Sequence, residues 1–136
     1  MKKFIFSGVI ALIATAVVSC GKYEEGPAFS LLTKKMRLTG DWTLENYTSD
    51  GQDITNFVQA AWGSAEWQIE KDGNYHITGN VNENGTWELG EDKDDVFFTP
   101  TNGSRDTYRI LRLKDTELWL RYTNSNGTYD IIKLNQ

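Results

Sequence analysis

The chain has 136 residues, a formal net charge of −5, one cysteine, one histidine and five tryptophans. This length is typical of a single domain. The acidic balance argues against a nucleic-acid binder, which needs a basic face. The lone cysteine excludes a disulfide framework and a cysteine-based zinc site.

The first 19 residues differ from the rest of the chain. Met1-Lys2-Lys3 is basic, residues 4–18 are almost wholly apolar, and Ser19-Cys20 follows. This layout predicts a cleaved secretory signal, because the apolar stretch is short for a membrane span. Without residues 1–19 the chain has 117 residues, with 12 basic against 19 acidic side chains and a net charge of −7.

Val17-Val18-Ser19-Cys20 followed by Gly21 resembles the lipobox of bacterial lipoproteins. The resemblance implies that Cys20 is acylated, with palmitate or a similar chain, and tethers a Gram-negative outer-membrane lipoprotein. The alternative is an ordinary signal peptide with a chance cysteine. Residues 20–27 form the acylated cysteine and a linker. Glu24-Glu25 in this linker is either a signal for the outer face of the membrane or a solvated spacer.

The folded domain is expected over residues 28–136, as an all-β unit with two short helices. Near-helical spacing of apolar residues predicts one helix over 27–38 and a second, capped by Thr55, over 53–62. Asn-Gly and Asp-Gly turns separate stretches rich in Thr, Trp, Tyr, Ile and Val. These stretches predict eight strands, at about 40–48, 64–71, 74–82, 86–90, 94–100, 105–114, 117–124 and 128–135.

The hydrophobic pattern predicts three-residue hairpin loops at 71–73, 83–85 and 125–127, each ending in a glycine. With these loops the apolar side chains of each hairpin share one face. The predicted cross-strand pairs are Ile69–Tyr75, Trp67–Ile77, Val81–Trp87, Gly79–Leu89, Leu120–Ile132 and Leu118–Leu134. Across a turn at Asp115-Thr116 they are Leu113–Leu118 and Leu111–Leu120.

One side of this meander is apolar and the other is polar. The predicted polar face carries Glu66, Gln68, Glu70, His76, Glu88, Arg112 and Lys133. The apolar side must be covered, and consecutive tight hairpins favour an antiparallel, eight-stranded up-and-down β-barrel over the competing two-sheet sandwich.

Thr39-Gly40-Asp41-Trp42, then Gly85-Thr86-Trp87, then Tyr108 through Tyr122, resembles the lipocalin-like domains of short bacterial outer-membrane lipoproteins. The resemblance implies that Gly40 passes close to the barrel floor and that Trp42 fills it. It also implies a late arginine over Trp42, for which Arg121 and Arg109 are both candidates. The predicted register places Arg121 outside, next to Trp119, and Arg109 inside.

Lipocalins typically hold small hydrophobic ligands, so the resemblance implies a non-catalytic binding module for a small hydrophobic or amphipathic molecule. The expected cavity wall is Trp67, Tyr75, Trp87 and Tyr122, and Phe57 and Trp62 are expected to form a lid over it. The alternative for these side chains is plain core and a hydrophobic cap.

The alternative function is that of a structural or interaction lipoprotein. Its barrel would be solid, and Phe57, Trp62 and the Trp119–Arg121 strip would contact another envelope or host protein. A further alternative is an inhibitor or a carbohydrate-binding surface protein. We expect no enzyme activity, cofactor or metal, because His76 stands alone on the outer face and no serine in a strained turn accompanies it.

Overall fold

A computed structural model describes residues 33–136 of the chain. The predicted signal at 1–19, Cys20, the linker at 20–27 and the first part of the predicted 27–38 helix lie outside the described residues. The elements of the described part follow in chain order: α1 (Lys34–Leu38), β1 (Gly40–Ser49), β2 (Gln52–Asp53), α2 (Thr55–Trp62), β3 (Glu66–Ile69), β4 (Asn74–Thr78), β5 (Glu83–Leu89), β6 (Asp95–Pro100), β7 (Asp106–Leu113), β8 (Glu117–Thr123) and β9 (Tyr129–Asn135).

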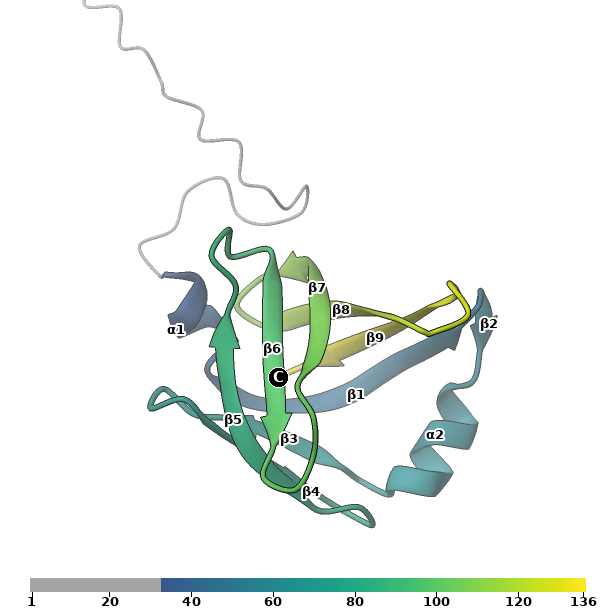
Figure 1. Cartoon of the computed structure of the whole chain (residues 1–136). Helices are drawn as coiled ribbons and strands as arrows, with labels where there is room; N and C mark the ends of the chain where they lie inside the picture. The colour runs from purple at the N-terminus through teal and green to yellow at the C-terminus, as the bar shows by residue number, and fades with distance from the viewer. Residues whose placement is uncertain (1–32) are drawn as a thin grey trace, which may run out of the picture.

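Eight of these strands form a closed antiparallel barrel (Figure 1). From β3 to β9 each strand pairs with the next one along the chain. β1 closes the ring because its first residues, Gly40 to Thr43, pair with β3 and the rest, Thr43 to Ser49, pair with β9. The two-residue β2 pairs antiparallel with the last two residues of β1, Thr48 and Ser49. The prediction of an eight-stranded up-and-down barrel is therefore confirmed.

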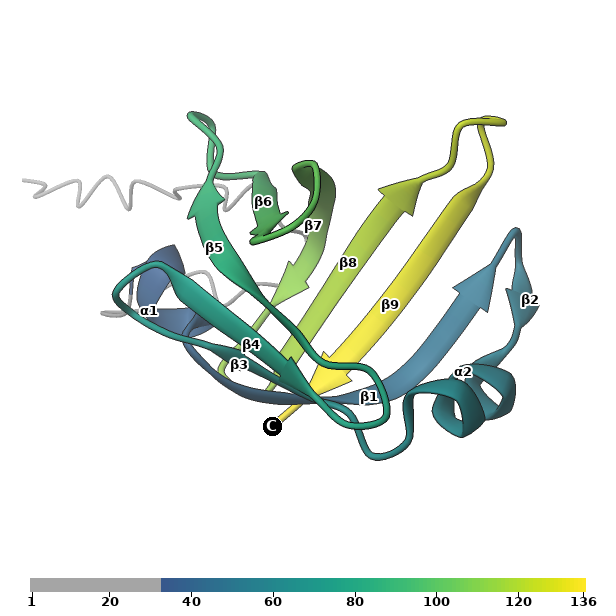
Figure 2. The ribbon, with the colours of Figure 1, turned by 60° about the horizontal axis from the view of Figure 1, so that its bottom comes forward.

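The two helices lie at different ends of the barrel (Figure 2). α1 covers the end where β1 begins. The Trp42 indole N–H donates to the Leu38 carbonyl at 2.9 Å, and both side chains are fully buried. This bond satisfies a polar group in the barrel floor and holds the end of α1 against it. In the described residues no helix is long and apolar enough to cross a membrane.

The two arginines considered as covers for Trp42 are both engaged elsewhere. The Arg121 guanidinium lies 4.6 Å from the ring centre of Tyr129. The Arg109 Nε lies 3.0 Å from the Asp95 carboxylate on the outer surface. The prediction that Arg109 faces inward is therefore wrong.

β-Bulges in β7 and β1 explain why Arg109 points outward and why Tyr108 and Tyr47 point inward. In β7 the register shifts between Ile110 and Arg112, so Ile110, in place of Leu111, pairs with Leu120. In β1 it shifts between Leu44 and Asn46. The extra residue of a bulge exchanges the inward and outward positions of the strand on one side of the bulge. Tyr108 and Tyr47 consequently point into the barrel, where both pack against the core.

Two of the three predicted hairpin loops are confirmed by the pairing. Ile69 pairs with Tyr75 across the 71–73 loop, and Leu120 pairs with Ile132 across the 125–127 loop. The glycines that end these loops have φ values of +96° and +86°, a conformation that favours glycine. The polar side chains of the outer face also follow this register, since Gln68 pairs with His76.

The middle hairpin differs from its prediction. Tyr75 pairs with Gly85 and Ile77 with Glu83, so the chain turns at 79–82 and Asn84-Gly85 lies within β5. A side chain at Gly85 would meet the Thr99 carbonyl, the Tyr75 ring and the Pro100 backbone. Glycine is therefore needed here for close strand approach, and its role in a turn was the wrong interpretation.

α2 begins differently from the expected Thr55 cap. Ile54 occupies the cap position and its side chain makes no capping hydrogen bond. The Thr55 hydroxyl instead accepts the Tyr47 backbone N–H at 2.9 Å and donates to Asp53 at 2.6 Å. The polar side chains at the start of α2 thus bind the helix to β1.

Large apolar side chains form the core of the barrel. Its buried members are Leu38, Trp42, Trp67, Ile69, Tyr75, Trp87, Val96, Phe98, Ile110, Leu113, Leu118, Leu120, Ile132 and Leu134. Burial of this many apolar side chains, at about 1.5–3 kcal/mol each, is the main stabilising contribution.

Replacement of Gly85 by alanine tests the close approach of β5 and β6. The added methyl group meets backbone atoms of Thr99 and Pro100, so Gly85→Ala should lower the free energy of unfolding by about 1–3 kcal/mol. Urea denaturation measures the change. Gly103→Ala is the matched control, because its new methyl group would meet only Pro100 at 3.4 Å. Equal stability of the two variants would contradict the steric argument.

Candidate binding cavity at the open end

The open end of the barrel lies where β1 parts from β3 beyond Thr43. α2 lies against β1 beside this gap, and Val58 is its one buried residue. Its C-terminal carbonyl, on Trp62, accepts the Asn80 N–H of the 79–82 turn at 2.8 Å. α2 is therefore tied to β1 at its start and to the β4–β5 hairpin at its end.

A cavity of about 160 Å³ lies beneath this helix. It has four aromatic side chains, four aliphatic ones and one carboxylate. Its lining is Tyr47, Trp62, Ala65, Trp67, Ile77, Val81, Glu83, Tyr108 and Ile132. An apolar cavity of about 150 Å³ can hold a molecule the size of benzene, whereas pockets for drug-sized ligands are about 300–1,000 Å³.

The aromatic rings of the cavity touch one another in edge-on and tilted arrangements. The Tyr47 and Trp62 rings are 5.8 Å apart and nearly perpendicular, at 86°. The Trp62 and Trp67 rings are 6.2 Å apart at 41°. Below them, Phe98 packs edge-on against both Trp67 and Tyr108. These contacts give the cavity rigid aromatic walls on several sides.

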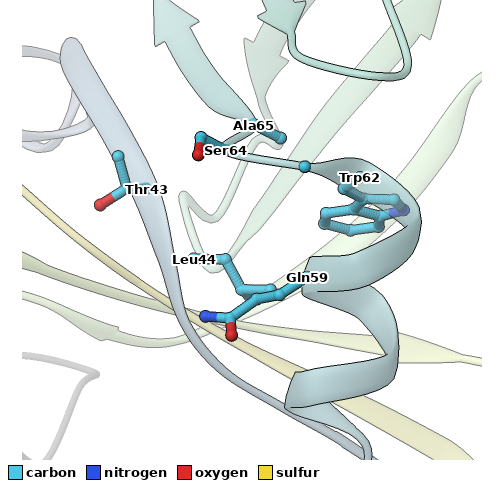
Figure 3. A pocket seen from close by; sticks show the side chains of 7 residues that line it. Thr43, Leu44, Gln59, Trp62, Ser64 and Ala65 are labelled. Atoms are coloured by element: carbon cyan, nitrogen blue, oxygen red, sulfur yellow. The ribbon is translucent and has the colours of Figure 1, made fainter.

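Trp62 also borders a second hollow, on the outside of the barrel between α2 and β1 (Figure 3). This outer depression is about 450 Å³ and is lined by Thr43, Leu44, Gln59, Trp62, Gly63, Ser64 and Ala65. Only Trp62 and Ala65 line both the outer depression and the cavity. Trp62 therefore forms a shared wall of the two spaces.

One acidic residue, Glu83, lines the cavity. Burial raises the pKa of Glu83, and the nearby Asp106 carboxylate raises it further, although contact with the Tyr75 hydroxyl acts in the opposite direction. Burial and Asp106 also raise the pKa of Tyr108. Within residues 33–136 neither Glu83 nor Asp106 forms an ion pair with a basic side chain.

Of the six side chains expected to bind a ligand, the structure brings two together at the cavity, Trp62 and Trp67. Tyr75 is buried deeper, edge-on to Phe98 at 5.0 Å. Trp87 lies toward the floor, where its indole N–H donates to the Glu70 carbonyl at 2.7 Å. Tyr122 packs against Tyr108 and faces a groove between β7 and β8.

Phe57 is not part of a lid. Its side chain is 74% exposed and borders a shallow hollow with Glu45 and Asn46 on the outside of β1. The face of α2 that turns inward carries Val58 and Trp62 instead. Of the predicted pair, only Trp62 lies over the cavity.

Sequence reasoning missed three polar or aromatic members of the lining, Tyr47, Glu83 and Tyr108. The two bulges turn the tyrosines inward, and the misplaced hairpin loop hid Glu83. One signal was available: a strict two-residue alternation from Trp42 would place Asn46 inside and the larger, less polar Tyr47 outside. That conflict favours a bulge.

His76 lies on the outer face of the barrel, where it pairs with Gln68. His76 Nε2 lies 3.0 Å from the Glu70 carboxylate and Nδ1 lies 2.7 Å from the Asn84 side-chain oxygen, so both ring nitrogens are occupied. In the described part of the chain no three His, Cys, Asp or Glu side chains are grouped to hold a metal ion.

Comparison with known proteins supports the fold and adds no function. No protein family and no curated protein matches the chain. A lipocalin-like protein from Bacteroides uniformis has a similar structure, with a TM-score of 0.51 and 14% sequence identity. The similar region covers 71% of this chain and 97% of that protein. The chain thus has a lipocalin-like barrel fold.

Removal of the Glu83 charge should stabilise the protein. Because the pKa of Glu83 is raised in the folded state, the folded state binds more protons, and stability falls as pH rises above the ordinary glutamate value of 4.5. Glu83→Gln should therefore raise the melting temperature at pH 7, and the gain should disappear below pH 4.5.

Thermal unfolding followed across this pH range measures the effect. Glu88→Gln is the control, since Glu88 is an exposed residue of the same strand. A Glu83→Gln variant less stable than the parent chain at pH 7 would contradict the prediction, because it would show that the carboxylate stabilises the folded state.

Proposed function

We propose that the protein is a lipid-anchored, non-catalytic binding module whose cavity takes a small apolar or amphipathic molecule. The observation that carries this proposal is the aromatic cavity at the open end of the barrel. A concave, mostly apolar site with one or two placed polar groups is the usual form of a ligand site. The lipocalin-like fold is consistent with binding.

The volume of the cavity limits the ligand to about the size of a substituted benzene. A long fatty acid or retinoid would need the Trp62 wall to move, which would join the cavity to the outer depression. The proposed ligand is therefore compact.

Membrane anchoring is the part of the proposal that depends on the sequence alone. A basic start, an apolar stretch and Ser19-Cys20-Gly21 support acylation of Cys20 and retention at the outer membrane. Absence of catalysis is supported by the outer-face position of His76, away from the cavity.

Binding of a compact aromatic molecule tests the proposed function. The full chain in neutral detergent should bind benzyl alcohol in isothermal titration calorimetry, and Trp62 and Trp67 should report it by a change in fluorescence. Ala65→Leu, which adds atoms to the cavity wall, should weaken binding at least about tenfold. Val81→Trp places its bulk at the half-exposed rim and gives a second blocking variant less dependent on core packing.

Phe57→Ala is the control, because Phe57 lies outside the cavity. Unchanged binding in that variant, with loss in the two blocking variants, supports the cavity as the site. No binding by the parent chain, together with no small molecule retained after purification from a lipid extract, would overturn the proposal.

Replacement of Cys20 tests the anchor. Cys20→Ser removes the only thiol that could be acylated, so the chain should move from the membrane fraction to the soluble fraction and lose radioactive palmitate. Ser19→Ala, next to it, should leave both unchanged. Palmitate incorporation in the Cys20→Ser variant would contradict the assignment.

An interaction surface is the second candidate function. Phe57, Val81 and Tyr129 are the large apolar side chains that elements at the open end expose. Trp119, in contrast, is covered by the Lys133 and Arg112 cations at 4.0 and 4.7 Å. A protein partner would therefore bind at the rim, where Phe57 offers the largest exposed contact.

A further inference from the structure

We propose that the cavity selects an organic cation, a compact molecule with an ammonium group, over neutral or anionic molecules of the same shape. This inference rests on the proposed function, and it names the chemical class of the ligand.

Four aromatic side chains form much of the cavity wall. Tyr47, Trp62, Trp67 and Tyr108 all line the cavity, and the ring planes of Tyr47 and Trp62 are perpendicular to each other. Rings set at such angles present both faces and edges to the enclosed space. A cation within about 6 Å of a ring face is attracted by the negative potential of that face, and several rings form a cage for substituted ammonium groups.

The carboxylate of Glu83 adds a negative charge to the cavity wall. It is the only charged side chain in the lining, and it is half-buried. Asp106 lies outside the lining, opposite Phe98 at the start of β7, and is close enough to raise the pKa of Glu83. A carboxylate taken out of water without a cationic partner destabilises the folded chain. An ammonium group in the cavity would supply that missing partner.

The arginines of the open end lie outside the lining of the cavity. Arg105 lies 3.9 Å from Glu88 and stacks over Phe97 at 4.2 Å. Arg109 pairs with Asp94 and Asp95, and Arg121 covers Tyr129. These three arginines line a separate hollow that also includes Asp106, and none of them lines the cavity. An anionic ligand would therefore meet Glu83 without a compensating positive group in the lining.

Choline and 3,3-dimethyl-1-butanol test the inference, because they have the same shape and differ in charge. With the full chain in neutral detergent at pH 7.5, choline should bind at least about tenfold more tightly than its neutral isostere. Glu83→Gln should remove most of this difference by weakening choline binding alone. Asp106→Asn should act in the same direction to a smaller extent.

Glu88→Gln is the matched control, on the same strand and on the outer face, and it should leave both affinities unchanged. Equal affinity for the two isosteres, or a charge preference that survives Glu83→Gln, would overturn the inference while leaving the proposed function in place. Failure of both compounds and of benzyl alcohol to bind would overturn the proposed function as well.

Discussion

The structure depends on one strand that pairs with two different neighbours. β1 closes the barrel by pairing with β3 through its first residues and with β9 through the rest. β3 has only four residues and begins at Glu66, which pairs with Thr43, so β1 and β3 separate beyond Thr43. The separation leaves a gap in the wall, and α2 fills it. The cavity, the outer depression and the position of the partly buried Trp62 between them all follow from this divergence.

Much of the barrel could be predicted from the sequence, because hairpin register and burial of one face constrain each other. The 71–73 and 125–127 loops placed Trp67, Ile69, Leu118 and Leu120 on the inner face, where the structure has them. The position of Trp42 at the floor, which the resemblance to lipocalin-like domains implied, is also where the structure has it. A slip of one residue would expose all of these side chains, so only one register was acceptable.

The cavity could be predicted only in part, because its lining depends on irregularities. Tyr47 and Tyr108 face inward because of bulges. A bulge inserts one extra residue into a strand, and the alternation pattern does not specify where this residue lies. Asn84-Gly85 has the sequence of a turn, yet Gly85 lies in a strand, where the absence of a side chain lets Thr99 and Tyr75 pack close to its backbone. At this site the local turn preference and the packing between strands favour different conformations, and the structure follows the packing.

The attachment of α2 has a consequence for how such a protein can diversify. None of the strand pairs that close the ring includes a residue of α2, and the helix is joined to the barrel through its two ends and the inward side chains Val58 and Trp62. Substitutions along this insert can therefore change the size and chemistry of the enclosed space without disturbing the hydrogen bonds of the sheet. The insert acts as an interchangeable wall, through which selection or a protein engineer can alter ligand choice while the barrel stays the same.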